Sequence, residues 1–254
     1  MNHEVTAVEI LGCRLDCIGI EEATERILKG ARGSVPSQVV TLGTEMVVAA
    51  QHDPRFRAVL ASSSLNLCDT IGVLAVARRR GAQLSERVTG VELIEHLCAA
   101  AAREALSIYL LGGAPGVAME AANRLAARYP TLRVAGAADG FFSAEESARV
   151  ALSIERSGAR ILFVGLGSPR QELWIADNLL ASGVGVGIGV GGAFDAIVGR
   201  VARAPLAWQR LNLEWLYRLI REPRRWRRQL ALPKFVGLII LDELRTALKR
   251  RASA

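Results

Sequence analysis

The chain has 254 residues, of which 51% are hydrophobic and 22% charged, a composition that suits a globular domain with a full core. Its four cysteines form no C-x-x-C pair and its three histidines do not cluster with them, so we expect neither a disulfide framework nor a zinc site. The N-terminus lacks a basic region followed by an apolar one, and the apolar runs are shorter than the roughly 20 residues that span a bilayer. A secretory signal and a membrane-spanning helix are therefore not expected.

Strand and helix patterns alternate along the chain. The apolar, β-branched runs predict strands over Val5–Ile10, Leu15–Ile18, Gln38–Thr41, Leu65–Leu67, Ser107–Leu111, Arg133–Ala137, Ile161–Val164 and Val184–Val190. Helical patterns cover Glu21–Arg32, Thr44–Ala50, Pro54–Ala61 and Ala144–Ser157, end at Arg80, Arg103 and Arg128, and begin again at Pro169. This alternation predicts an α/β fold with a Rossmann-like, mostly parallel sheet covered by helices on both faces. We expect this core over residues 1–209 and a basic helical appendage over residues 210–254.

Polar residues follow several of the predicted strands. These residues are Thr41, Asp69, Asp139, Gln171 and Asp195. In a parallel sheet, ligands bind where the carboxyl ends of strands meet helix N-termini, because backbone N–H groups and the helix dipole favour anions there. Taken singly, Thr and Asp at such positions also serve as helix caps or turn residues. Asp69 is the strongest candidate, because an acid directly after the apolar run LNLC has little other use at a sheet edge.

One glycine-rich segment admits a different function. Residues 187–192 read G-I-G-V-G-G, which satisfies the G-x-G-x-x-G pattern of nicotinamide-dependent oxidoreductases. The context does not fit, because these glycines lie within and at the end of an apolar strand, and Arg200 and Pro205 interrupt any following helix. Close backbone packing in a crowded strand is the alternative interpretation. A catalytically silent scaffold of polysaccharide assembly is a further alternative.

Three blocks of sequence are more specific than any glycine motif. The stretches GLGSPRQELWI, GVGGAFDAIVGRVARAP and LEWLYRLIREPRRWRR closely resemble signature blocks of the WecG/TagA/CpsF family of bacterial glycosyltransferases, glycosyltransferase family 26. Weaker matches such as TLGTEMVVAA, CDTIGVLAVARR and YLLGGAPGVA occur in the expected order. The resemblance extends from about Val8 to about Arg228.

The resemblance implies a reaction class. Members of this family transfer a sugar from a UDP-sugar donor to a polyprenyl-diphosphate-linked acceptor at the cytoplasmic face of the cell membrane, in cell wall or exopolysaccharide biosynthesis. They invert the anomeric centre, and they use no metal and no cofactor. N-acetylmannosamine, its uronic acid and glucose occur among the donor sugars of relatives, and one chain does not distinguish them. The appendage could complete its own active site or a neighbour's, so a homo-oligomer stays open.

The resemblance also assigns roles to residues. The proposed catalytic base falls on Asp69. The substrate-binding residues fall on Thr41, Arg87, Gln171, Arg218, Arg225 and Arg228. The nucleotide-binding positions are Phe141, Asp195 and the glycine turns at Gly112, Gly113, Gly140 and Gly167, whose backbone N–H groups we expect to face the diphosphate. The chain departs from the family pattern at Gly43, where relatives have Asn, and at Cys68 and Thr70, which stand where relatives read P-D-G.

A mechanism without metal is consistent with these residues. No D-x-D triplet occurs in the sequence, so the usual pair of carboxylate ligands for a divalent cation is absent. Arginine supplies permanently charged, bidentate donors that suit a departing diphosphate. We therefore expect arginines of the appendage, with the glycine turns, to replace the metal.

The appendage accounts for the basic balance of the chain. Residues 218–254 carry 11 basic and 3 acidic residues, whereas the preceding 217 carry 21 and 22. Pro223 should end a helix, and a later helical face gathers Val236, Ile239, Ile240, Leu244, Ala247 and Leu248, flanked by basic residues, Trp226 and Phe235. Packing on the domain or a dimer contact would explain this face. The lipid-linked acceptor favours instead an anionic membrane surface over nucleic acid as the partner.

Overall fold

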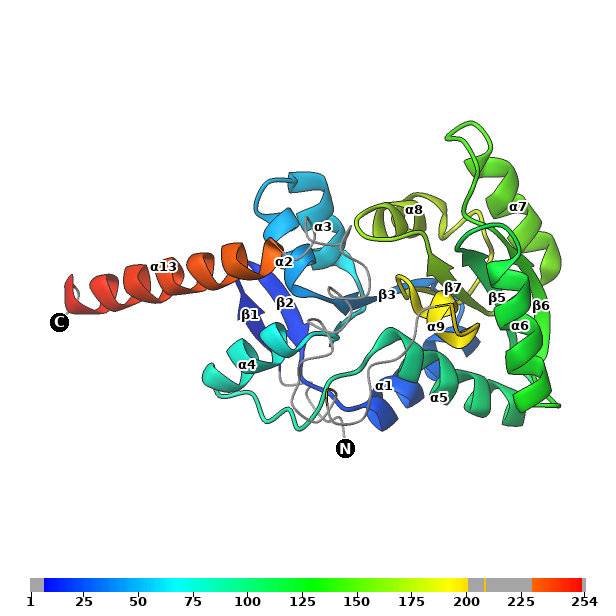
Figure 1. The fold of residues 1–254 in the computed structure, drawn as a ribbon, viewed down its shortest axis with the longest axis horizontal. Coiled ribbons are helices and arrows are strands. Elements are labelled where there is room, and N and C mark those ends of the chain that lie inside the picture. The colour runs from blue at the N-terminus through cyan, green and yellow to red at the C-terminus, as the bar shows by residue number, and fades with distance from the viewer. Residues whose placement is uncertain (1–6, 201–207, 209–229, 253–254) are drawn as a thin grey trace.

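A computed structural model describes residues 7–200, 208 and 230–252. Its central sheet contains β3 (Ser37–Leu42), β4 (Leu65–Cys68), β5 (Ser107–Gly112), β6 (Arg133–Ala138), β7 (Ile161–Gly165) and β8 (Val186–Gly189). All neighbouring strands are parallel, in the order β4-β3-β8-β7-β5-β6 (Figure 1). The predicted parallel α/β sheet is confirmed.

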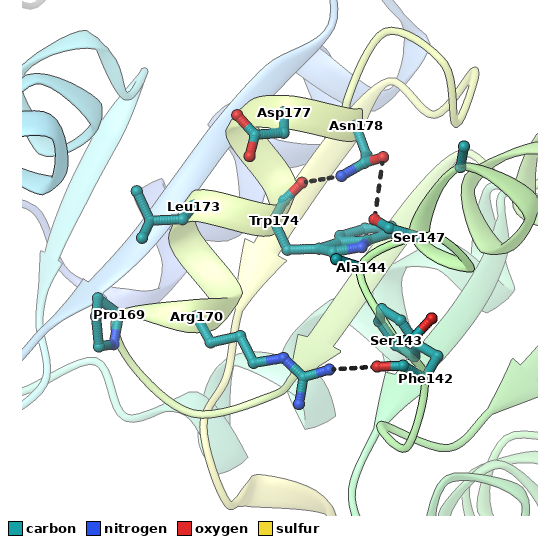
Figure 2. A pocket seen from close by; sticks show the side chains of 11 residues that line it. Phe142, Ser143, Ala144, Ser147, Pro169, Arg170, Leu173, Trp174, Asp177 and Asn178 are labelled. Carbon is teal, nitrogen blue, oxygen red and sulfur yellow. Dashed lines mark hydrogen bonds between the residues drawn. The ribbon is translucent and has the colours of Figure 1, made fainter.

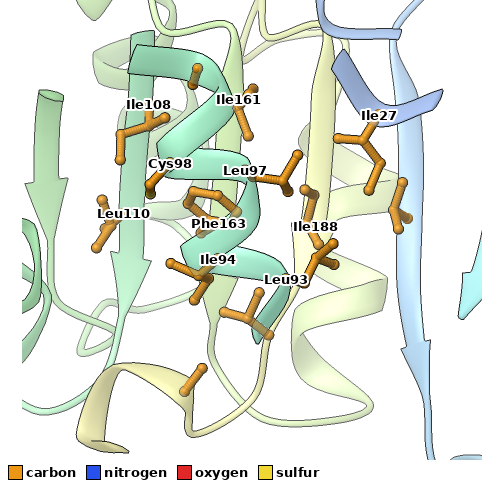
Figure 3. Close-up of a cluster of buried hydrophobic side chains, with 14 of the residues drawn as sticks. Ile27, Leu93, Ile94, Leu97, Cys98, Ile108, Leu110, Ile161, Phe163 and Ile188 are labelled. Carbon is orange, nitrogen blue, oxygen red and sulfur yellow. The ribbon is translucent and has the colours of Figure 1, made fainter. Parts of the chain in front are cut away.

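Helices cover both faces of this sheet. They are α1 (Ile20–Arg32), α2 (Thr44–Ala50), α3 (Pro54–Ser62), α4 (Ile71–Arg79), α5 (Gly90–Arg103), α6 (Val117–Arg128), α7 (Ser147–Ser157), α8 (Arg170–Asn178) and α9 (Ala193–Ile197), followed by α13 (Ala231–Ala252). Side chains of α1, α5, α6 and α9 share one buried cluster with the sheet. Figure 3 shows Leu93, Ile94 and Leu97 of α5 packed over Phe163 and Ile188. Helices α7 and α8 bury Ile154 and Trp174 against the opposite face.

The first two strands lie outside the central sheet. β1 (Ala7–Ile10) and β2 (Cys13–Asp16) form a separate antiparallel hairpin. Leu11 and Gly12 between them have φ values of 51° and 79°, the left-handed conformation that a tight two-residue hairpin requires. The Asp16 carboxylate accepts a hydrogen bond from the Asn66 backbone N–H at 2.7 Å. This bond fixes the hairpin against β4.

The predicted element boundaries mostly agree with those observed to within two residues, and the start of α7 differs most. The helix expected from Ala144 begins at Ser147, because the first turn is tighter, with the Ser147 N–H donating to the Ala144 carbonyl at 3.2 Å. Ahead of it, the Ser143 N–H donates to Glu146 Oε2 at 2.9 Å and the Glu146 N–H donates to Ser143 Oγ at 3.3 Å. These reciprocal bonds hold a turn ahead of the helix. The strand expected over Val184–Val190 is confined to β8, which contains two closely packed glycines.

The C-terminal helix docks on the domain through its first turns. Phe235 and Ile239 are 1% and 7% exposed in the cluster that also contains Val47 and Val73. The expectation that these two side chains belong to a lipid-facing surface is wrong, because they fill the domain core. Two ion pairs, Arg79–Glu243 at 2.9 Å and Arg80–Asp242 at 2.7 Å, extend the contact.

The later turns of α13 project from the domain (Figure 1). Five of its apolar side chains, Val236, Ile240, Leu241, Leu244 and Leu248, are about half exposed or more. Within the described residues, no helix combines the length and the apolar character needed to cross a bilayer. The expected domain boundary at 209/210 and the helix end at Pro223 lie outside the described residues.

Candidate active site

The predicted polar residues meet at one edge of the sheet. Asp69 follows β4, and Thr41 lies near the end of β3. Asp195 lies in α9, which follows β8, and Gln171 lies in α8, which follows β7. These four strands are adjacent and parallel, so their carboxyl ends lie side by side. Neighbouring strands are about 4.8 Å apart, so the four ends span about 15 Å. The structure therefore brings together on one edge the residues that the sequence distributes over some 150 positions.

Asp69 and Arg87 lie close together beside the end of β4. The Val88 N–H donates to the Cys68 carbonyl at 2.7 Å, and the Asp69 N–H donates to the Leu42 carbonyl at 3.2 Å. The pKa of the Cys68 thiol is raised to about 12, chiefly by burial and also by the Asp69 charge, while the Arg87 charge opposes the rise. Both charged groups thus lie near enough to the Cys68 thiol to affect its pKa.

The two departures from the family pattern are also neighbours. The Thr44 N–H donates to Thr70 Oγ1 at 3.2 Å, so Thr70 takes up a free donor of the first turn of α2. A Cβ at Gly43 would lie 2.9 Å from Glu45 Oε2. Gly43 thus leaves room for the Glu45 carboxylate near Thr70. The place of Glu45 at the end of the TLGTE block was the sequence signal that could have identified it.

The glycine turns bring three strands into backbone contact. Gly112 has a φ of 132°, and a Cβ there would lie 2.4 Å from the Gly165 carbonyl oxygen. The Gly113 N–H donates to that oxygen at 3.0 Å, and the Gly140 N–H donates to the Gly113 carbonyl at 3.0 Å. The expectation that these two N–H groups face a diphosphate is wrong, because both are engaged within the turns. Glycine is required here by close packing.

Two further predicted nucleotide positions border these turns. Phe141 is 75% exposed, and its N–H donates to Asp139 Oδ1 at 2.9 Å. Asp139 therefore serves as a turn residue, which was the alternative to a role in ligand binding. Gly167 has a φ of 78° and accepts the Gln171 N–H at 2.9 Å. The Phe141 ring is thus presented to solvent at the sheet edge, where a nucleobase could stack on it.

Gln171 is buried at the centre of the edge. It is 2% exposed, and its Oε1 accepts the Gly191 N–H at 2.9 Å while its Nε2 donates to Glu172 Oε1 at 2.6 Å. Glu172 thus lies in the first turn of α8 and accepts a hydrogen bond from the Gln171 amide. Burial raises the pKa of Glu172, and hydrogen bonds from Gln171 and Ser168 act in the opposite direction.

Thr41 contacts the same turn. Its side chain is buried, and Thr41 Oγ1 donates to the Gly189 carbonyl at 2.9 Å. The glycines of β8 are crowded: a Cβ at Gly187 would lie 2.8 Å from Ile175 Cγ2, and one at Gly189 would lie 2.7 Å from Gln171 Nε2. The following helix, α9, has five residues. These contacts confirm close packing, rather than dinucleotide binding, as the reason for the glycines.

A cavity of about 850 Å³ lies beside this edge, between α8 and the segment leading into α7 (Figure 2). Arg170 lies 5.0 Å above the Phe142 ring, which meets Trp174 at 6.2 Å between ring centroids. Trp174 is 6% exposed and packs in the buried cluster that also contains Ile154. Asp69, Thr41 and Asp195 do not line the cavity, so the strand ends define the candidate site.

Three predicted substrate-binding arginines, Arg218, Arg225 and Arg228, lie outside the described residues. In the described ranges, no group of three or more His, Cys, Asp or Glu side chains is arranged to hold a metal ion.

The family of the chain follows from the comparison with family models. The model described as "Glycosyl transferase WecG/TagA/CpsF family" matches residues 8–249, nearly the whole chain. The match includes the strand ends that carry Asp69, Thr41, Gln171 and Asp195, together with α13 to within its last turn. The chain belongs to the WecG/TagA/CpsF family of glycosyl transferases.

Proposed function

We propose that this glycosyl transferase moves a sugar from a UDP-sugar to a polyprenyl-diphosphate-linked acceptor, inverting the anomeric centre without a metal ion. The observation that carries the proposal is the set of strand ends: an acid and a cation, Asp69 and Arg87, lie two strands from the turn that carries Asp195. An acceptor would bind at β4 and β3, and the nucleotide at β8, β7 and the glycine turns.

The chemistry needs a base and a stabiliser of the leaving group. Asp69 takes the proton of the acceptor hydroxyl as that oxygen attacks the anomeric carbon, and the bond from this carbon to the UDP oxygen breaks. Because Gly113 and Gly140 donate within their own turns, the negative charge on UDP needs other donors. Arginine guanidinium groups of the appendage, together with Arg87, are suited to this role.

A donor screen tests this function. Purified protein is mixed with a short-chain polyprenyl-diphosphate acceptor and UDP-N-acetylmannosamine, its uronic acid or UDP-glucose, and UDP release and product mass are measured with and without EDTA. Transfer from one donor that persists in EDTA is expected. Loss of transfer in EDTA overturns the metal-free mechanism, and absence of transfer from any donor favours the silent scaffold.

Arg225→Ala is expected to reduce kcat by about 10- to 100-fold, because a hydrogen bond to a charged group is worth about 1.5–3 kcal/mol. Arg156→Ala, at an exposed position of α7, removes the same charge elsewhere and should leave kcat unchanged. The measurement is UDP release at saturating donor. Full turnover by the Arg225 variant would show that the leaving group is stabilised by other residues.

We also propose that the exposed side of α13 binds the anionic inner face of the membrane, where the acceptor is held. Ile240→Glu, at a 52% exposed position, should weaken co-sedimentation with vesicles containing phosphatidylglycerol by about tenfold, since burial of one such side chain contributes about 1.5–3 kcal/mol. Thr246→Glu adds the same charge at an exposed polar position of the helix and serves as the control. Equal sedimentation of the two variants would contradict membrane binding through Ile240. A change in oligomeric state confined to Ile240→Glu would assign the surface to self-association.

A further inference from the structure

Two consecutive polar residues at the start of α8 are buried as deeply as core side chains. Gln171 is 2% exposed and Glu172 is 0% exposed. Burying such groups is costly unless they are hydrogen bonded, so their partners indicate what they hold in place. The Glu172 carbonyl accepts a hydrogen bond from Gln38 Nε2 of β3 at 3.0 Å. The Glu172 backbone is thus held to the sheet by a hydrogen bond that does not involve its side chain.

The direction of the side-chain hydrogen bonds follows from one backbone donor. The Gly191 N–H can only donate, so the Gln171 atom 2.9 Å away must be the amide oxygen. The Gln171 Nε2 then faces Glu172, whose Oε1 is 2.6 Å away and must accept. A carboxylate accepts only, so it opposes a flip of the amide. Two hydrogen bonds therefore connect the Glu172 carboxyl to the turn after β8.

The strand beside this pair has a backbone that accommodates it. A Cβ at Gly189 would lie 2.7 Å from Gln171 Nε2 and 2.9 Å from Glu172 Oε1. Gly191 has a φ of 54°, which places it in the left-handed region that favours glycine. The turn that begins there leads directly into α9 and Asp195. The position of Asp195 therefore depends on a turn whose first N–H is held by Gln171.

We propose that Glu172 is a positioning residue for glycosyl transfer: it fixes the Gln171 amide and, through it, the Gly191 turn that presents Asp195 to the nucleotide. The proposal rests on the function proposed above. Glu172 is fully buried, and Asp69 follows β4, which lies three strands from β7 along the sheet. Loss of Glu172 should therefore weaken donor binding much more than it slows the chemical step.

The test compares two replacements of the same carboxyl. Glu172→Ala should raise the KM for the UDP-sugar and the Kd for UDP by about tenfold, with kcat within about threefold, since a buried hydrogen bond is lost. It should also accelerate amide hydrogen exchange at Gly191, measured by NMR, by about tenfold. Glu172→Gln retains an acceptor oxygen with the same reach and should restore all three quantities to within about threefold of the parent.

Two more variants separate positioning from loss of stability. Gly189→Ala retains the Glu172 side chain but places a methyl group against both the Gln171 amide and Glu172 Oε1, so it should disrupt their hydrogen bond and reproduce the effects of Glu172→Ala. Leu28→Ala empties part of the buried cluster on α1 and should lower the Tm without changing the KM or the Gly191 exchange rate. If Glu172→Ala does not fold, the Gly189→Ala and Glu172→Gln variants still test whether Glu172 holds the Gly191 turn through Gln171.

The proposal is overturned if Glu172→Gln is as impaired as an alanine at that position, or if Gly191 exchange is the same in Gly189→Ala as in the parent. Failure of the proposed function has a different signature. In that case the parent protein transfers no sugar from any donor, while the exchange rate of Gly191 still reports whether Glu172 holds the turn.

Discussion

Asp69→Asn is expected to lower kcat by about 10²- to 10⁴-fold, the usual contribution of a general base. The amide has nearly the same shape as the carboxylate but cannot take a proton, so the Asp69 N–H bond to the Leu42 carbonyl and the fold around it should persist. The KM for the UDP-sugar should change by less than about threefold, because the nucleotide site lies on other strands. Steady-state UDP release with saturating acceptor measures both quantities.

The matched control is Asp177→Asn, which makes the same substitution on the exposed surface of α8, where the carboxylate pairs with Arg55. Such a surface pair contributes about 0–1 kcal/mol, so neither kcat nor Tm should shift appreciably. Retention of full turnover by the Asp69 variant would remove the central element of the mechanism. A loss of turnover accompanied by an equal fall in Tm would indicate a structural role.

Phe235→Ala is expected to reduce the free energy of unfolding by about 3–5 kcal/mol, the usual cost of emptying a buried phenylalanine site. The ring is 1% exposed, and its Cε1 would lie 3.7 Å from a Cβ at Gly72, so it fills the space between α13 and α4. Removing it should also release α13 from the domain and increase proteolytic cleavage within that helix. Urea unfolding and limited proteolysis measure the two effects.

The adjacent Val236 provides the control for this substitution. It is 49% exposed, so Val236→Ala should change the free energy of unfolding by no more than about 0.5 kcal/mol. If the two variants unfold at the same urea concentration, α13 does not depend on Phe235 for its attachment.

The sheet could be predicted because its strands are buried on both faces. Runs such as Ile161–Val164 are continuously apolar and β-branched, which distinguishes them from the amphipathic helices between them. The hairpin of β1 and β2 could not be placed, since a short strand carries no sign of which partner it pairs with. The docking of α13 was missed for a related reason: Phe235 and Ile239 suit a core and a lipid surface equally well, and a helical pattern does not distinguish the two.

The edge of the sheet that holds the site was predictable, whereas the connections within it were not. Asp69, Thr41 and Asp195 were identified because the residue after a parallel strand must lie at the carboxyl edge. The engagement of the Gly113 and Gly140 N–H groups depends on how far each strand extends, which the apolar pattern does not determine. The Gln171–Gly191 bond joins residues 20 positions apart and depends on strand register.

The strand order also divides the site between two consecutive stretches of the chain. The ends of β3 and β4, with Gly43, Thr70 and Arg87, come from residues 37–88, whereas the glycine turns and the Asp195 segment come from residues 107–195. Each stretch contributes its own side of the edge, and α5 joins them. Substitutions at positions 43 and 70 can therefore accumulate during divergence without disturbing the opposite half. Under the proposed function, evolution can thus vary the recipient of the sugar while the turn that carries Asp195 keeps its contacts.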